Sequence, residues 1–436
     1  MDHFTRIIEK RVDGIPAGIY SACSANEYVL KAALEAGREN NTPVLIEATA
    51  NQCNQFGGYT GMNPAGFVAF VKRMAKESGL APDMLILGGD HLGPLTWQNE
   101  SESSAMRKSD ELIAQYVLAG FTKIHLDTSM RLAGDDRNVR LSDEIIANRA
   151  ARLAKAAELA YARLKAGDPM APPPLYVIGS EVPIPGGVRE HKDSPECGVE
   201  VTTPEQFSET YETFKSVFHA GGLEDAFSRV IGVVIEAGIE FSDDGIVEYD
   251  RNKAYALTNR LKQYEGIVFE GHSTDYQTRQ KLKQMVEDGI AMLKVGPALT
   301  FYFREAVFAL ADIEKELSPG FPSDLKAVLD NEMINNPGNW TNYYSGSDKE
   351  LSFKRKYSLS DRCRYYFPAK NVSNALGRLI SNINASRVPL SLLSQFMPTA
   401  IARLRESDSK ITAENLIKAR IKDCIEDYLY ATNIYL

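Results

Sequence analysis

The strongest constraint on the fold is a regular alternation of two kinds of segment. Short apolar runs, typical of buried parallel strands, recur along roughly the first 300 residues, and each closes on a polar residue or a glycine. Segments with the 3.6-residue periodicity of amphipathic helices separate these runs. The runs expected to be strands are residues 18–22, 43–49, 84–91, 122–127, 175–181, 230–236, 266–272 and 290–296.

Two of the separating segments carry clear helix-end signals. Asn63 can cap a helix whose first position is Pro64, and Gly120 can end a second helix that begins near Ser103. An α/β protein with eight such units fits a (β/α)8 TIM barrel, whose usual length of about 250 residues also matches. A doubly wound open sheet is the alternative, but the chain has neither the G-x-G-x-x-G turn nor the P-loop expected of a nucleotide-binding sheet.

The pattern changes after about residue 318, where helical and aromatic-rich segments replace the alternation. Examples are residues 324–333, 357–368 and 414–431. We therefore expect two parts. Residues 1–318 form the barrel and carry the site, and residues 319–436 form a helical C-terminal extension packed on the barrel.

Composition excludes several classes of function. The net charge of −9 gives no basic footprint for a nucleic acid. No apolar run approaches the ~18 residues of a membrane span, and the charged start of the chain lacks the apolar core of a signal peptide, so a cytoplasmic location is expected. The five cysteines are scattered and never in C-x-x-C spacing, so we expect neither a disulfide framework nor a thiolate zinc site.

The residues that close the predicted strands are the informative ones, because in a TIM barrel the carboxyl ends of the strands carry the active site. Three of the six histidines are among them, together with several carboxylates and one lysine. These residues are Glu47, Asp90, His91, His125, Asp127, Glu181, Glu236, Glu270, His272 and Lys294.

Imidazole and carboxylate groups together are what a divalent cation such as Zn²⁺, Mn²⁺, Co²⁺ or Ni²⁺ requires. The sequence therefore predicts a metal or acid–base site at this rim. His3, His191 and His219 fall in terminal, loop and helix contexts and are expected at the surface. Two glycine-containing stretches, residues 181–187 with Gly186 and Gly187 and residues 294–298, place backbone amides near the rim, where they could approach a phosphate or a sugar hydroxyl.

Seven stretches together resemble the family of the so-called non-catalytic Z subunit of class II tagatose-bisphosphate aldolase, and the resemblance covers essentially the whole chain. The stretches are EATANQCNQFGGYTGM (47–62), LGGDHLGP (87–94), KIHLDTSM (123–130), GSEVPIPGG (179–187), EGHSTDYQT (270–278), LKVGPALTF (293–301) and YSLSDRCRYYFP (357–368).

The resemblance implies a TIM barrel related to class II ketose-bisphosphate aldolases and a place in bacterial galactitol, tagatose and amino-sugar catabolism. It implies one of two activities. Some members are accessory subunits that stabilise a separate class II aldolase catalytic subunit, and others are metal-dependent 4-epimerases that interconvert tagatose and fructose, free or as 6-phosphates. Asp90 and His91 resemble the Asp-His pair that supplies the base and a metal ligand in class II aldolases, although here Leu92 follows the pair and Gly88 and Gly89 precede it.

Chemistry favours one route for a ketose 4-epimerase. The C4 proton is not α to the C2 carbonyl, so the enzyme must either oxidise C4, which needs a nicotinamide cofactor, or break and re-form the C3–C4 bond. The second route needs a Lewis acid and a base. We assign His91 and His272, with His125 or Glu181, as metal ligands, Asp90 as the base, and Asp127 or Glu270 as a second acid or orienting group.

Other contacts and alternatives remain open. Lys294 could neutralise substrate charge, and Glu47, Gly186, Gly187, Ser273, Arg362 and Arg364 are candidate substrate-binding residues. The two arginines fit interdomain salt bridges slightly better. A Schiff base on Lys294 is a weaker alternative, because it would not need the histidines. The small-molecule partner is a ketose or ketose phosphate, and an aldolase subunit or further copies of the chain are compatible protein partners.

Overall fold

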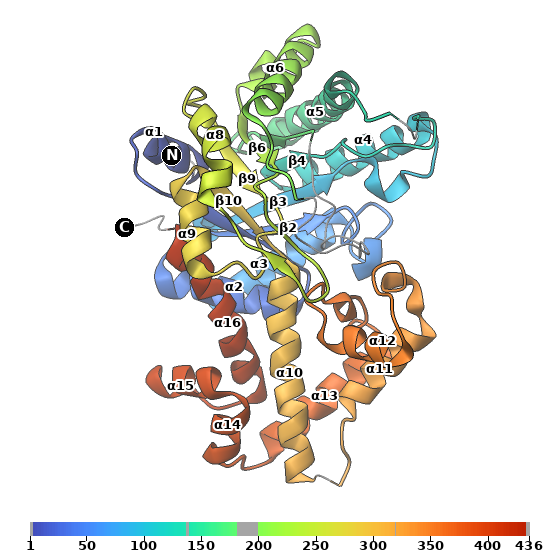
Figure 1. The fold of residues 1–436 in the computed structure, drawn as a ribbon, viewed down its shortest axis with the longest axis vertical. Coiled ribbons are helices and arrows are strands. Elements are labelled where there is room, and N and C mark those ends of the chain that lie inside the picture. Colours follow the sequence, from blue (N-terminus) through green and yellow to red (C-terminus); the bar gives the residue numbers. More distant parts are fainter. Residues whose placement is uncertain (1–2, 137–138, 181–198, 319, 433–436) are drawn as a thin grey trace.

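The computed structural model describes residues 3–136, 139–180, 199–318 and 320–432. Eight parallel strands close into a barrel in the order β1-β10-β9-β6-β5-β4-β3-β2, and helices surround it (Figure 1). The barrel strands are β1 (Ile19–Cys23), β2 (Val44–Thr49), β3 (Leu85–Leu92), β4 (Lys123–Leu126), β5 (Leu175–Ile178), β6 (Val230–Ile235), β9 (Val268–Gly271) and β10 (Ile290–Val295). The predicted (β/α)8 barrel is confirmed, with a strand at each of the eight expected places.

The helices of the barrel part follow the strands. They are α2 (Glu27–Asn40), α3 (Pro64–Ser78), α4 (Glu102–Ala119), α5 (Asp143–Gly167), α6 (Pro204–Ala220), α7 (Glu224–Phe227), α8 (Arg251–Leu261), α9 (Arg279–Glu287) and α10 (Pro297–Leu317). The end signals act as expected, since the Asn63 side chain accepts a hydrogen bond from Gly66 N and Gly120 is left-handed after α4. One antiparallel pair, β7 (Glu240–Phe241) and β8 (Ile246–Val247), lies between β6 and α8 and was not predicted.

The barrel interior is built in layers because alternate residues of a strand point to the same side. The layer nearest the amino ends of the strands is apolar and includes Ile19, Leu45 and Met292. Helix α1 (His3–Val12) packs Phe4 and Ile7 into this layer at the amino ends of the strands. Polar and charged side chains fill the inward positions above it, toward the carboxyl ends.

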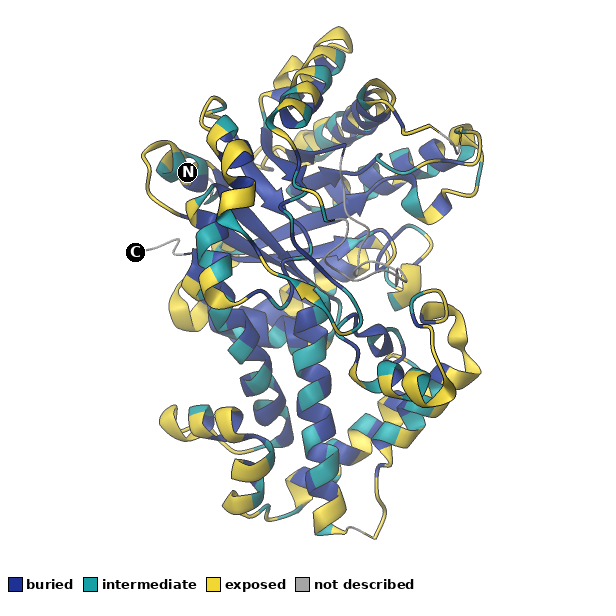
Figure 2. Cartoon of the chain, in the orientation of Figure 1, coloured by how far each residue is buried: buried dark blue, intermediate teal, exposed yellow. Residues whose placement is uncertain are grey.

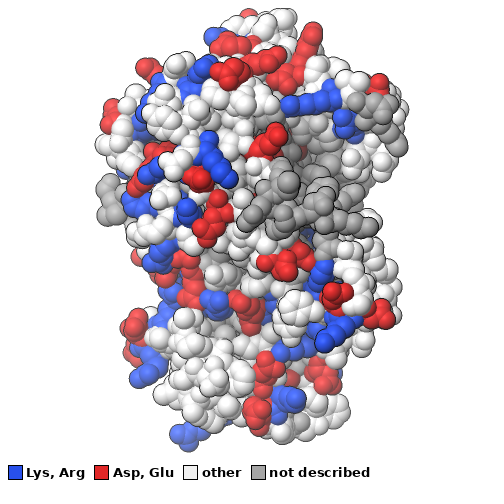
Figure 3. Space-filling model, in the orientation of Figure 1, with Lys and Arg blue, Asp and Glu red and all other residues white. Residues whose placement is uncertain are grey.

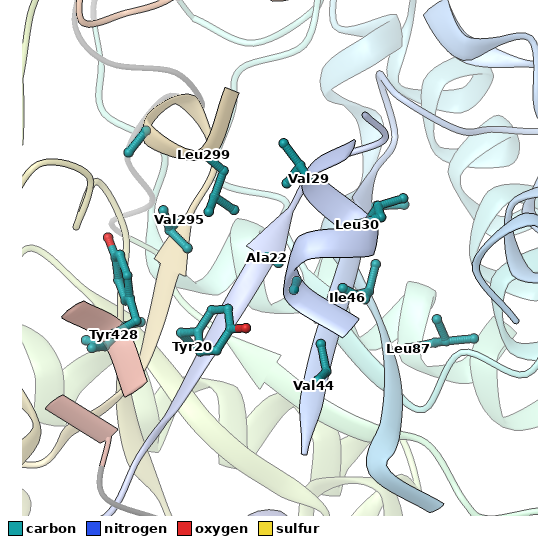
Figure 4. Close-up of a cluster of buried hydrophobic side chains, with 14 of the residues drawn as sticks. Tyr20, Ala22, Val29, Leu30, Val44, Ile46, Leu87, Val295, Leu299 and Tyr428 are labelled. Atoms are coloured by element: carbon teal, nitrogen blue, oxygen red, sulfur yellow. The ribbon is translucent and has the colours of Figure 1, made fainter. Parts of the chain in front are cut away.

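The outward residues of the strands pack under the helices and form the main hydrophobic core, so that the strands are buried on both faces (Figure 2). In Figure 4, Ala22, Ile46 and Leu87 lie on three successive strands of this core. Tyr428 of α16 (Ala413–Thr432) lies against the same core, and its ring centroid is 5.9 Å from that of Tyr20 on β1.

The remaining helices form the C-terminal part of the molecule. They are α11 (Leu325–Asn335), α12 (Asp348–Tyr357), α13 (Lys370–Ala385), α14 (Leu390–Phe396), α15 (Pro398–Glu406) and α16. α10 and α16 run side by side from the barrel toward the other helices (Figure 1). α16 also packs against α2 and α9, so the last helix of the chain covers the outside of the barrel between them.

The exposed surface of the molecule carries both kinds of charge. Acidic and basic side chains are interspersed on the face that Figure 3 shows. Among the described residues, no helix is both long and apolar enough to cross a membrane. The four described cysteines are free.

Candidate metal centre and active site

The end of β3 presents two neighbouring side chains to the barrel interior. Successive residues of a regular strand point to opposite faces, yet Asp90 and His91 both belong to the same buried group. His91 has a left-handed φ of 46°, and the register of β3 against β4 shifts between Gly89 and Leu92. Such an irregularity re-aims a side chain, so the break in the strand brings the imidazole to the same side as the carboxylate.

Two glycines make this strand end possible. A Cβ on Gly88 would lie 2.6 Å from Oε1 of Glu47, and a Cβ on Gly93 would lie 1.8 Å from the carbonyl oxygen of Asp127. Any larger residue would therefore displace either a charged side chain or the backbone directly after β4. The glycines around the Asp-His pair are explained by this close packing.

Three histidines from three strand ends meet over the barrel. The ring centroids of His91, His125 and His272 lie 4.9–5.3 Å apart. One ligand atom from each ring and one carboxylate oxygen of Asp90 all lie within 4.8 Å of one another, and all four residues are buried. This group is a possible metal site, and it unites four of the residues predicted from the sequence.

Carboxylates orient two of the three rings. Nδ1 of His91 lies 2.8 Å from Oδ2 of Asp127, and Nε2 of His272 lies 3.0 Å from Oε1 of Glu270. A histidine held in this way by a carboxylate presents its other nitrogen in a fixed direction. These bonds leave Nε2 of His91, which lies 3.7 Å from Oδ1 of Asp90, and Nδ1 of His272 as the ring atoms that the two carboxylates do not hold.

The third ring has an unsatisfied atom. Nδ1 of His125 lies 3.2 Å from the backbone nitrogen of His91 and 3.3 Å from Oδ1 of Asp90. Nε2 of His125 is buried and has no hydrogen-bond partner among the described residues. A buried polar atom without a partner costs free energy, so a ligand is expected to satisfy it.

A layer of ion pairs lies directly below the histidines. The fully buried Lys123 on β4 has its Nζ 2.6 Å from Oε1 of Glu47 on β2 and 2.5 Å from Oε2 of Glu270 on β9. Lys294 on β10 pairs with Glu47 and Asp90. The network therefore links the inside of the barrel across five strands.

The charges of this region favour a cation. Glu47, Asp90, Asp127 and Glu270 are four carboxylates, so together with Lys123 and Lys294 they leave a net charge of −2 when the histidines are neutral. A divalent cation would balance that charge in a region where water is excluded. The donor set of imidazole nitrogens and a carboxylate oxygen fits Zn²⁺, Mn²⁺, Co²⁺ or Ni²⁺.

The protonation of the site follows from burial and charge. Burial lowers the pKa of His272 to about 3, so this ring is neutral and able to bind a metal. Burial alone would also lower the pKa of His91, but Asp90 and Asp127 outweigh it and raise that pKa above its usual value. Burial opposes ionisation of Asp127, yet the bond to His91 lowers its pKa to about 2.

The chain was compared with known protein families. A family profile described as D-tagatose-1,6-bisphosphate aldolase subunit GatZ/KbaZ-like matches residues 4–433. The chain belongs to the GatZ/KbaZ-like family. The resemblance found in the sequence is thereby confirmed, and the chain is related to tagatose-bisphosphate aldolase.

The solved structures similar to this GatZ/KbaZ-like chain include the following two. A crystal structure described as a probable tagatose 6 phosphate kinase from Sinorhizobium meliloti 1021 is 41% identical, with a TM-score of 0.85, over 95% of this chain and 100% of that one. A fructose-bisphosphate aldolase from Campylobacter jejuni is 13% identical, with a TM-score of 0.46, over 87% of this chain and 92% of that one.

Other predicted residues of this GatZ/KbaZ-like chain lie around the centre or outside the described residues. Glu181, Gly186 and Gly187 lie outside the described residues. Glu47 is fully buried between the two lysines, and Ser273, with a left-handed φ of 53°, contacts the Glu240 side chain. The direct contact of these residues with a substrate stays a prediction.

The two arginines of the C-terminal segment are held mainly by backbone oxygens and aromatic rings. Arg362 donates to the carbonyl oxygen of Asn339 at 2.7 Å and lies over the ring of Tyr343. Arg364 donates to the carbonyl oxygen of Asp361 at 3.0 Å and to the Tyr365 hydroxyl at 3.0 Å. No salt bridge of either arginine is found among the described residues, so the interdomain salt bridges favoured for this pair are not formed there.

Sequence reasoning missed two site residues. Lys123 opens β4, and the alternation Lys123, His125, Asp127 at inward positions was the signal that could have revealed it. Asp275 was the other. Its carboxylate accepts hydrogen bonds from the amides of Gly296 and Ala298, which the sequence had offered as donors to a phosphate or sugar.

Proposed function

We propose that this protein is a metal-dependent ketose 4-epimerase that interconverts tagatose and fructose, free or as 6-phosphates. The convergence of His91, His125, His272 and Asp90, with Nε2 of His125 left unsatisfied, is the observation that carries the proposal. When bound, a divalent ion would act as a Lewis acid on the C2 and C3 oxygens of the sugar. The three histidines would hold the ion, with Asp90 beside them as the base.

The residues of the chain supply the rest of the chemistry. Asp90 is ionised, because His91 and Lys294 lower its pKa well below the usual value even though burial opposes this. Its carboxylate takes the proton of the C4 hydroxyl, and the C3–C4 bond breaks. The electron pair of that bond goes to C3, which leaves a C2–C3 enediolate and an aldehyde at C4.

The second half of the reaction reverses the first. The aldehyde fragment turns to present its other face, C3 attacks C4, and the new C4 oxygen takes back the proton from Asp90. No electrons are gained or lost overall, so no redox cofactor is needed. Asp127 and Glu270 act as positioning residues, because each holds one histidine ring by its outer nitrogen.

The closing test uses the purified full chain. The protein is stripped with a chelator, Mn²⁺, Zn²⁺, Co²⁺ or Ni²⁺ is restored separately, and fructose and tagatose are assayed free and as 6-phosphates. We expect metal-dependent interconversion that falls by at least about 100-fold in His91→Ala and in His272→Ala. His219→Ala is the matched control, because His219 is exposed on α6.

A second function has one supporting observation, the family description as an aldolase subunit. In that case the barrel stabilises a separate class II catalytic subunit. Absence of turnover with every metal, combined with activation of an added class II tagatose-bisphosphate aldolase subunit, would replace the epimerase by this accessory role.

A further inference from the structure

The loops after the last two barrel strands are where TIM barrels frequently bind a substrate phosphate. The usual donors are backbone amides of these loops and of a helix that begins there. In this chain the corresponding elements are the loop after β9, which begins at His272, and the amino terminus of α10, three residues after Lys294. Both elements therefore start from residues of the candidate active site.

A carboxylate of the chain itself occupies this position. Oδ1 of Asp275 accepts a hydrogen bond of 3.0 Å from the amide of Gly296 and one of 2.8 Å from the amide of Ala298. Pro297, between them, has no N–H to offer. Asp275 is 3% exposed, so its carboxylate is enclosed rather than lying at the edge of the site. The helix terminus that would attract a phosphate is thus already satisfied.

Both neighbours of Asp275 are anchored, which keeps the carboxylate in place. Thr274 donates its hydroxyl to the carbonyl oxygen of Lys294 at 2.6 Å, and the Tyr428 hydroxyl lies 2.9 Å from the carbonyl oxygen of Thr274. On the other side, the hydroxyl of Tyr276 donates to the carbonyl oxygen of Leu359. Tyr428 belongs to α16, so the C-terminal part of the chain helps to hold the loop.

The charges around Asp275 also disfavour a bound phosphate. The buried Glu240 lies close enough for the two carboxyl groups to interact electrostatically. Arg364 is near enough to stabilise the charged form of Asp275. Its nitrogens, however, already donate to the carbonyl oxygens of Ser360 and Asp361 and to the hydroxyl of Tyr365. An incoming phosphate would therefore meet a carboxylate where it needs free donors.

We propose that Asp275 is a specificity-determining residue that takes the place of a substrate phosphate, so that the protein binds ketoses with at most one phosphate and rejects ketose bisphosphates. The inference rests on the proposed function, since it concerns the sugar that the same site would bind. The sugar that this barrel would bind then differs from the bisphosphate that appears in the description of its family.

The test measures binding as well as turnover. Fructose 1-phosphate, fructose 6-phosphate and fructose 1,6-bisphosphate are titrated calorimetrically into the metal-loaded full chain. We expect the bisphosphate to bind at least about 10-fold more weakly than the tighter of the two monophosphates, because one of its phosphates must face Asp275. Equal or tighter binding of the bisphosphate would overturn the inference.

Variants test whether Asp275 is the residue that weakens bisphosphate binding. Asp275→Ala frees both amides and should tighten bisphosphate binding at least about 10-fold, and Asp275→Asn, which keeps the shape and loses the charge, should give a smaller gain. Asp244→Ala removes an exposed carboxylate of the β7–β8 turn and should change nothing. An unchanged preference in an Asp275→Ala protein that still unfolds cooperatively would contradict the inference. If both Asp275 variants fail to fold, the affinity of the wild-type protein for the bisphosphate relative to the monophosphates still tests the inference.

Inorganic phosphate distinguishes this inference from the proposed function. Titrated into metal-free full chain, it should bind Asp275→Ala at least about 10-fold more tightly than wild type, whether or not the protein turns over any sugar. Absence of epimerase activity with this difference preserved would contradict only the proposed function. Epimerase activity with equal phosphate binding in wild type and variant would contradict only the role of Asp275.

Discussion

At the scale of single residues, Asp127 shows how the site depends on groups that do not face its centre. Its carboxylate holds Nδ1 of His91 at 2.8 Å. We expect Asp127→Asn to weaken metal binding by about 10- to 100-fold, since an amide neither fixes the ring as firmly nor raises its basicity. Calorimetric titration of metal into chelator-treated protein measures this.

The control for this variant is Asp110→Asn. Asp110 pairs with Arg152 on the partly exposed side of α4, away from the histidines. Metal affinity should stay at the wild-type value there. Equal affinities for the Asp127 variant and wild type would show that His91 does not need its carboxylate, or that it is not a ligand.

Glu240 carries a pH-dependent cost to stability. Burial raises its pKa from 4.5 to about 7, so the folded state holds a proton that the unfolded state has lost between those pH values. The free energy of unfolding therefore falls as pH rises through this range. We expect Glu240→Gln to be about 2 kcal/mol more stabilising at pH 8 than at pH 5.

Denaturant unfolding at the two pH values tests this prediction. Glu248→Gln is the matched control, because Glu248 is exposed in the same region and should show no such difference. A Glu240→Gln protein whose stability relative to wild type is independent of pH would show that the carboxyl group ionises as readily in the fold as in the unfolded chain.

The sequence predicted most of the residues that meet at the site, and the reason is physical. Strand periodicity determines which residues end at the carboxyl rim, and His91, His125 and His272 could be placed there from the run of apolar residues before them. It could not show that His91 adopts a left-handed φ, nor that Asp275 fills the amide donors at α10. Both depend on contacts between distant segments.

At the scale of elements, α1 has a clear structural role. Its Phe4 and Ile7 pack into the apolar layer at the amino ends of the strands and close the barrel opposite the site. Phe4 is 2% exposed, so we expect Phe4→Ala to lower the free energy of unfolding by about 3 kcal/mol. Chemical denaturation of the variant gives the value.

The other face of α1 provides the comparison. Arg6 is exposed, so Arg6→Ala should change stability by no more than about 0.5 kcal/mol. Equal effects of the two substitutions would show that α1 contributes little to closing the barrel. The long elements were predictable because each carries its own periodicity, whereas β7 and β8 are two residues each and have no period to detect.

At the scale of the whole molecule, the barrel and the C-terminal part depend on each other. The division near residue 318 stays a prediction, but α16 packs on α2, α9 and α10, and the carbonyl oxygen of Thr432 accepts a bond of 2.7 Å from the amide of Gly18. We propose that the first 318 residues do not fold stably alone, because the outer face of β1 would be exposed to water.

A truncation series tests this dependence. A chain that ends at residue 318 should lack the near-ultraviolet dichroism of packed aromatic residues and should bind a hydrophobic dye. A chain that ends at residue 432 keeps α16 and should unfold like the full chain. Cooperative unfolding of the shorter chain at the full-length midpoint would establish an independent barrel.

The buried Lys123 has a consequence for how the barrel closes. Its partners Glu47 and Glu270 come from β2 and β9, far apart in the sequence. If either strand paired one residue out of step, its carboxylate would turn to the opposite face and leave a charge without a partner in the interior. Misaligned closures are therefore penalised, and the charges beneath the active site also help to specify which barrel this chain forms.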